Sequence, residues 1–160
     1  MEQFNLFGLL FMLIILIPNA LYAFLNRGRL PKTEKHKILE PIEQIGRIGC
    51  IAFMTVNIPG TVFGWQSDTA FAIYLCVNFV LSLTYCILWG VFWKSHNLAK
   101  ALTLSIIPSV LLLFSGVMCR SILLLISSVI FVPAHILISC KDAKAAAKDE
   151  EGLVFYNTKR

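Results

Sequence analysis

Four polar side chains near the middle of long apolar runs are the residues best suited to bind a ligand. They are Asn19, Asn57, Asn78 and His135. At a rise of 1.5 Å per residue, Asn57 and Asn78 lie about 3 to 5 Å to one side of the centre of their runs. On the same scale, Asn19 and His135 lie about 5 to 8 Å to the other side. Four polar groups therefore straddle the centre of the predicted bundle.

Proline stands beside three of these four residues, and this allows two interpretations. Each of Pro18, Pro59 and Pro133 frees the backbone carbonyl four residues earlier, as does Pro108 between Ser105 and Ser109. The first interpretation is that Asn, Ser and His side chains cap these kinks and join helices by hydrogen bonds. The second is that the kinked helices enclose a central polar cavity for a small ligand. The four polar residues would line this cavity.

Catalytic chemistry is not predicted. His135 is a candidate proton carrier, but the sequence indicates no carboxylate partner for it. Paired carboxylates, a nucleophile with its base and a metal-ligand set are likewise not indicated. We therefore expect a protein that is not an enzyme, with no catalytic residue, metal or cofactor. The five cysteines are interpreted as packing residues, with a disulfide between Cys76 and Cys119 as the alternative.

Five apolar runs must position these side chains. Hydrophobic residues make up 58% of the chain and charged residues 14%, and the mean hydropathy is +0.76. Such values are typical of proteins that cross a membrane several times. Each run is long enough to cross about 30 Å of hydrocarbon as a helix. The runs are Leu6 to Leu25, Gly46 to Trp65, Ala70 to Trp93, Ala101 to Met118 and Ser121 to Ser139. The prediction is an all-α, five-transmembrane-helix bundle over residues 1–139, followed by a charged tail over 140–160.

The basic residues predict the orientation. Of the 14 Lys and Arg residues, all except Arg120 fall on one side when the runs are threaded alternately through a membrane. Basic loops stay in the cytoplasm, so the N-terminus is expected outside and the C-terminus in the cytoplasm of a multi-pass plasma-membrane protein. The first loop is expected to contact anionic lipid or a partner through Arg27, Arg29, Lys32, Lys35 and Lys37. Expected partners are the lipid bilayer and either another membrane protein or a second copy; nucleic acid is not expected.

Local patterns predict further features. Apolar residues from Ile38 to Ile45 recur at helical spacing and predict a short interfacial helix that leads into the second run. On it, Glu43 and Arg47 form an i,i+4 pair. Gly46, Gly49 and Ala52 predict close helix packing. After the fifth run, a charged helix is expected to continue to Gly152, with disorder beyond it.

Five strings of residues resemble those of small five-span bacterial membrane proteins whose activity is uncharacterised. The strings are Glu43-Gln44-Ile45-Gly46-Arg47, Asn57-Ile58-Pro59, Ser105-Ile106-Ile107-Pro108-Ser109, Phe114-Ser115-Gly116 and Pro133-Ala134-His135-Ile136. The resemblance implies a bacterial plasma membrane and supplies no activity. We therefore expect an accessory, immunity or sensor-like protein, with a small-molecule or lipid carrier as the alternative.

Overall fold

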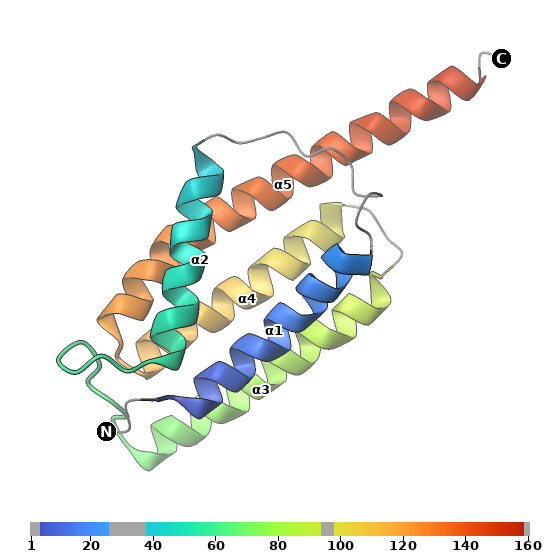
Figure 1. Cartoon of the computed structure of the whole chain (residues 1–160). Helices are drawn as coiled ribbons and strands as arrows, with labels where there is room; N and C mark the ends of the chain where they lie inside the picture. The colour runs from blue at the N-terminus through green and yellow to red at the C-terminus, as the bar shows by residue number, and fades with distance from the viewer. Residues whose placement is uncertain (1–3, 26–37, 94–97, 159–160) are drawn as a thin grey trace.

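The computed structural model describes residues 4–25, 38–93 and 98–158, and these form five α-helices (Figure 1). The helices are α1 (Leu6–Leu25), α2 (Leu39–Thr55), α3 (Asp68–Val91), α4 (Leu98–Met118) and α5 (Ile122–Thr158). Three segments are long and apolar enough to cross a membrane: Asp68–Val91, Lys100–Met118 and Ile122–Ala145. The predicted all-α class is confirmed, since the described residues pair only as isolated β-bridges.

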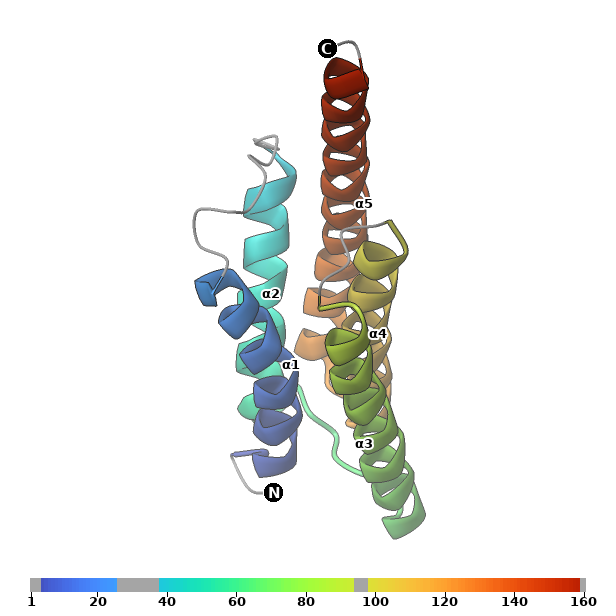
Figure 2. The ribbon, with the colours of Figure 1, turned by 90° about the vertical axis from the view of Figure 1, so that its right-hand side faces the viewer.

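The helices form two layers. Figure 2 shows α1 and α2 in one layer, and α3, α4 and α5 in the other. Contacts between helices follow this arrangement, because α2 packs chiefly on α5, α4 lies between α3 and α5, and α1 touches α3 and α2. We call the end where segment 56–67 lies the loop end, and the end from which α5 leaves the bundle the tail end.

The second helix differs from its prediction. The run Gly46 to Trp65 is expected to be one helix, but α2 ends at Thr55 and Val56 is extended, with ψ 122°. Pro59 disfavours helical backbone in the preceding residue and cannot donate a hydrogen bond. Gly60 and Gly64 have φ values of 82° and 73°, in the left-handed region that favours glycine. At its other end α2 begins at Leu39, so the predicted interfacial helix is its first two turns.

Backbone hydrogen bonds hold the loop end together. The N–H of Asn5 donates to the Thr55 carbonyl at 2.8 Å, and the N–H of Ile122 donates to the Thr61 carbonyl at 3.0 Å. Asn5 also caps α1, because its side chain accepts from the N–H of Gly8 at 2.9 Å. The end of α2 is thereby tied to the residues before α1, and segment 56–67 is tied to the start of α5.

The predicted tight turn between α4 and α5 is confirmed. Arg120 adopts a left-handed conformation with φ 50°, and the N–H of Ser121 donates to the Gly116 carbonyl at 3.0 Å. This is the arrangement of a Schellman helix end. The Ser121 hydroxyl then accepts from the N–H of Leu124 at 3.4 Å at the start of α5. The two helices therefore form an antiparallel hairpin.

Two glycines allow α2 to lie close to α5, as their spacing predicts. A Cβ atom at Gly46 would lie 2.8 Å from the backbone of Phe131, and one at Gly49 would lie 2.5 Å from the Ser127 hydroxyl. Cβ atoms do not approach other heavy atoms so closely, so only glycine permits this separation. The small-residue pattern of α2 therefore serves packing within one chain.

The fifth helix runs further than predicted. The charged continuation of the apolar run is helical as expected, but α5 passes Gly152 and ends only at Thr158. Disorder was expected over Leu153 to Arg160, and this is wrong for the residues up to Thr158. One glycine costs a helix about 1 kcal/mol, which the helix-forming residues around it can offset. Figure 1 shows this half of α5 projecting beyond the tail end of the bundle.

Candidate functional site

A cluster of three ionisable side chains lies between α2 and α5 toward the tail end. Glu43 is 4% exposed. Its Oε1 atom accepts a hydrogen bond from Arg47 Nη2 and lies 3.1 Å from His135 Nδ1. Arg47 and His135 are less buried, with 40% and 22% of their side chains exposed. A buried carboxylate thus holds two basic side chains, one from its own helix and one from α5.

The cluster is one rung of a regular antiparallel contact between α2 and α5. Glu43 faces His135, Gly46 lies against Phe131, and Cys50 Sγ lies 3.7 Å from the Ser128 hydroxyl. Each step along α2 toward its C-terminus therefore meets an earlier position of α5. The register places the Glu43 carboxylate beside the imidazole ring, which also stacks on Phe131 with ring centroids 4.6 Å apart.

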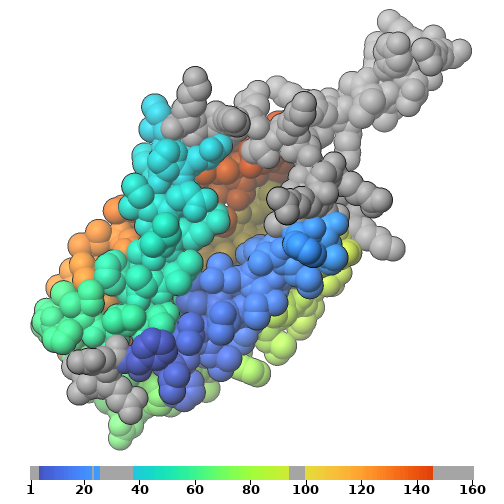
Figure 3. Space-filling view, in the orientation of Figure 1, coloured from blue at the N-terminus to red at the C-terminus, as the bar shows by residue number. Residues whose placement is uncertain are grey.

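Beside this cluster is a cavity of about 230 Å³ between the two layers. Two of the three cluster residues line it, Arg47 and His135, and Asn19 of α1 joins them. Most of the remaining lining is apolar and comes from all four surrounding helices: Met12, Ile15, Leu16, Cys50, Pro108, Leu112 and Phe131. Figure 3 shows the surface hollowed between α1 and α2, with α4 and α5 behind. The cavity is therefore mainly apolar, with three polar residues contributed by α1, α2 and α5.

Covalent catalysis with His135 as the base would need a side-chain nucleophile next to it. Cys50 lines the same cavity, but it lies at the next polar rung of the α2 and α5 contact. Seven residues along each helix separate the rungs, or about 10 Å at 1.5 Å per residue. Catalytic nucleophiles and their bases lie within about 3 Å of each other. Cys50 is therefore not placed to exchange a proton with His135.

The four predicted cavity residues are only partly brought together. Asn19 and His135 line the cavity described above. Asn57 lies after the end of α2 and lines a separate cavity of about 470 Å³ at the loop end, together with Trp65 and Phe71. Asn78 is fully buried and accepts a hydrogen bond from the Ser115 hydroxyl at 3.0 Å. It joins α3 to α4, as the structural interpretation of the sequence predicts.

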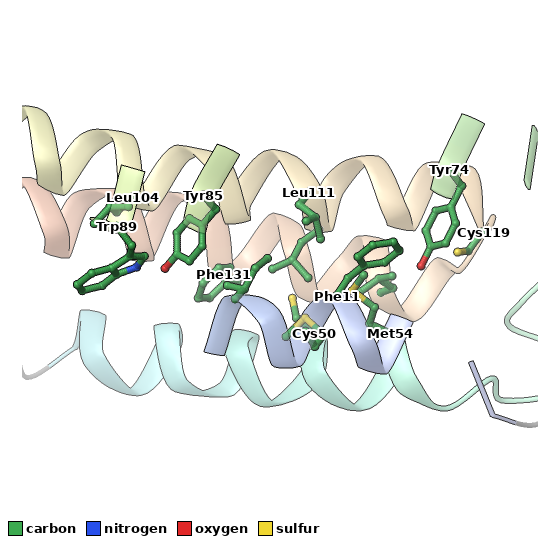
Figure 4. Packing of buried hydrophobic residues seen from close by; sticks show 14 residues of the cluster. Phe11, Cys50, Met54, Tyr74, Tyr85, Trp89, Leu104, Leu111, Cys119 and Phe131 are labelled. Carbon is green, nitrogen blue, oxygen red and sulfur yellow. The ribbon is translucent and has the colours of Figure 1, made fainter. Parts of the chain in front are cut away.

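Toward the loop end the bundle is closed by a packed core. Figure 4 shows Phe11, Met54, Tyr74 and Cys119 filling this part of the interior. Phe11 and Tyr74 meet edge to face, with ring centroids 5.9 Å apart. Gly8 of α1 lies against the carbonyl of Met54, where a Cβ atom would clash. These contacts separate the two cavities.

The polar side chains bond to carbonyls other than those that proline frees. Pro18 frees the carbonyl of Ile14, but Asn19 donates to that of Ile15 at 3.1 Å. Pro108 frees the carbonyl of Leu104, but Ser109 donates to that of Ser105 at 2.7 Å. In these two helices the polar side chain therefore bonds to the carbonyl of the residue next to the freed one.

Other predicted features have different outcomes. The residues predicted to contact lipid or a partner lie outside the described residues: Arg27, Arg29, Lys32, Lys35 and Lys37.

All five cysteines are free; Cys76 is exposed and Cys119 is buried, so the alternative of a disulfide between them is wrong. Lys100 is buried, with its ammonium group 4.4 Å from the centre of the Tyr22 ring. A charged group near the start of α4 therefore contacts α1.

The sequence did not indicate Glu43 as a partner of His135. The pattern predicts Glu43 on an exposed i,i+4 pair, and that pair with Arg47 is present. The missed contact joins residues 92 positions apart. One feature of the sequence could have indicated its burial: Glu43 lies three residues before Gly46, so the two residues share one face of α2. That face packs closely on another helix.

Comparison of the chain with protein-family models, curated proteins and solved structures gives no match.

Proposed function

We propose that this is a non-enzymatic, multi-pass plasma-membrane protein that binds a small amphipathic molecule or lipid in the cavity between α1 and α2. The observation that supports this is the composition of the cavity: Asn19, Arg47 and His135 supply polar groups, and the rest of the lining is mainly apolar. Ligand cavities in proteins typically combine apolar walls with a few polar groups that fix orientation. An amphipathic molecule matches both parts.

The proposal includes the predicted topology, with five spans, the N-terminus outside and the C-terminus in the cytoplasm. The three helices long and apolar enough to cross a membrane support it, together with the shorter apolar segment Leu6–Tyr22 of α1. α2 packs along α5 over its length and would complete the set. In this orientation the cavity lies in the cytoplasmic half of the bilayer, on the side of the basic first loop.

A cavity-filling substitution tests the proposal. Leu16 lines the cavity, whereas its neighbour Ile17 is 58% exposed. Native mass spectrometry of the protein released from lipid nanodiscs should show a retained lipid or other amphiphile on the wild type. Leu16→Trp should lose this adduct because the indole ring fills the cavity. Ile17→Trp, which adds the same volume on the lipid-facing side, should keep it.

Equal retention by both variants would contradict the proposal, since binding would then not involve the cavity. Thermal unfolding in detergent provides the control for folding. The two variants should unfold within a few degrees of each other, because Leu16 gains its larger side chain where space is already present.

A sensor-like role is a second candidate, favoured by one property of α5. This helix supplies His135 to the cavity and continues without interruption to Thr158, beyond the bundle. A ligand that contacts His135 would therefore contact the same helix that projects from the tail end. Cross-linking of the projecting part in cells, with wild type and with Leu16→Trp, tests this role: a partner captured by the wild type alone supports it.

A further inference from the structure

We infer that the amphiphile bound in this cavity is a single-chain lipid with an anionic head group, a carboxylate or a phosphate, and that Arg47 binds that group. The inference rests on the proposed function and adds the chemical class of its ligand. Three observations support it: the side chain that brings charge to the cavity, the way Glu43 is held, and the size of the enclosed space.

Arg47 has the capacity to bind a second anion. A guanidinium group carries five N–H donors in a planar fork, and the ion pair with Glu43 uses Nη2. The side chain is 40% exposed and forms part of the cavity wall. Carboxylates and phosphates match the fork geometry of arginine, and a charge-assisted bond strengthens where water is excluded. An anionic head is therefore the complement of this wall.

Glu43 would repel an anion unless it were held by another group, and His135 holds it. The Oε1 atom of Glu43 is shared, with Arg47 Nη2 and His135 Nδ1 both against it. With Nδ1 directed at Glu43, the His135 ring can retain the carboxylate while the guanidinium group turns toward a ligand. Glu43 and His135 are thus positioning residues for Arg47. The Asn19 amide nitrogen donates one hydrogen bond to the Ile15 carbonyl and carries a second N–H that can donate to a head-group oxygen.

The volume indicates how much of the ligand is enclosed. At about 230 Å³ the cavity is smaller than those that enclose drug-sized molecules, which are about 300 to 1,000 Å³. It accommodates a head group and the first part of one chain between Met12, Leu16 and Phe131. The rest of the chain would lie along the hollow between α1 and α2 that Figure 3 shows. A single-chain lipid meets this requirement with no second chain to place.

The experiment compares two probes that differ in head-group charge and by one methyl group. Binding of a pyrene-labelled fatty acid and of its methyl ester is measured by fluorescence in detergent micelles, with the full chain. The wild type should bind the acid at least about tenfold more tightly than the ester, the loss expected when a charge-assisted bond is removed. Arg47→Gln should bind both probes alike, at the affinity of the ester. Arg120→Gln, a matched change at the loop end, should keep the wild-type preference.

Arg47→Lys separates a loss of charge from a loss of folding. It keeps the positive charge without the fork, so it should retain a reduced preference for the acid. Dodecyl phosphate should displace the probe from the wild type, and inorganic phosphate at the same concentration should not.

Each contrary outcome has a distinct meaning. Equal binding of acid and ester by the wild type would overturn the anionic head group while leaving the proposed cavity intact, provided that Leu16→Trp blocks both probes. Displacement by inorganic phosphate would overturn the lipid and leave a site for a soluble anion. Failure of the wild type to bind either probe, with no retained amphiphile, would overturn the proposed function itself.

Discussion

Glu43 and His135 are in contact across the interface of α2 and α5, with Oε1 and Nδ1 3.1 Å apart, although 92 residues separate them in the chain. The contact fixes the register of the two helices together with the Gly46 and Phe131 approach. It also places Arg47, which shares the same carboxylate oxygen, at the wall of the cavity. Packing of these helices and composition of the cavity are therefore linked through one carboxylate.

The first prediction concerns the strength of this contact. A double-mutant cycle of Glu43→Gln and His135→Gln should give a coupling free energy of about 1 kcal/mol, near the values for interhelical hydrogen bonds in membrane proteins. Reversible unfolding in mixed micelles provides the measurement. The pair Asn78→Ala with His135→Gln serves as control and should be additive. Additivity of the Glu43 and His135 changes would mean that the two groups do not interact.

The second prediction concerns the buried carboxylate. Arg47→Ala should destabilise the bundle by about 1 to 3 kcal/mol, because the buried Glu43 carboxylate loses one of its two partners and keeps only His135. Adding Glu43→Gln to this variant should recover much of the loss, since the unpaired charge is then removed. The measurement is the free energy of unfolding of Arg47→Ala, compared with that of the double variant. A double variant less stable than Arg47→Ala would show that Glu43 is not penalised by losing its partner.

The third prediction concerns the approach of α2 to α5. Gly46→Ala should destabilise the bundle by about 1 to 3 kcal/mol, because its Cβ atom would meet the backbone of Phe131. Gly90→Ala in α3 is the matched control, as nothing lies within 4 Å of its Cβ position. It should be neutral or stabilising by up to about 1 kcal/mol from helix propensity. Similar effects of the two changes would contradict the close approach.

The fourth prediction concerns the orientation in the membrane. In a cysteine-free background, a membrane-impermeant thiol reagent added to intact cells should label Ser67→Cys, at the start of α3. It should leave Lys144→Cys, which follows the predicted apolar run Ser121 to Ser139, unlabelled until the cells are opened. The reverse pattern would overturn the proposed orientation. Labelling of both positions would mean that the number of spans between them is even.

Features that depend on neighbouring residues were predictable from the sequence. An uninterrupted apolar run gives α1 its bounds, and the tight turn at Arg120 follows from the few residues between two long runs. Hydropathy alone was insufficient at α2, because Pro59 and Gly60 end the helix inside an apolar run. A count of apolar residues does not detect the change from helical to extended backbone after Thr55.

The site was harder to predict because it depends on contacts across the fold. Asn19 and His135 line the same cavity, and polar groups inside long apolar runs are conspicuous in a sequence. Asn57 and Asn78 carry the same signal but lie in the loop-end cavity and in the contact of α3 with α4. The burial of Glu43 follows from the α2 and α5 register, which residue spacing within either helix does not specify.

The most direct test of the account is a distance between the bound head group and Arg47. Solid-state NMR on the protein in lipid, with a fatty acid labelled with ¹³C at its carboxyl group and arginine labelled with ¹⁵N at its guanidinium group, measures it. We predict dipolar dephasing for a carbon-to-nitrogen separation of about 4 Å, as in a hydrogen-bonded ion pair, that disappears in Arg47→Lys. A saturating fatty acid that shows no dephasing, or dephasing unchanged in Arg47→Lys, would contradict the account.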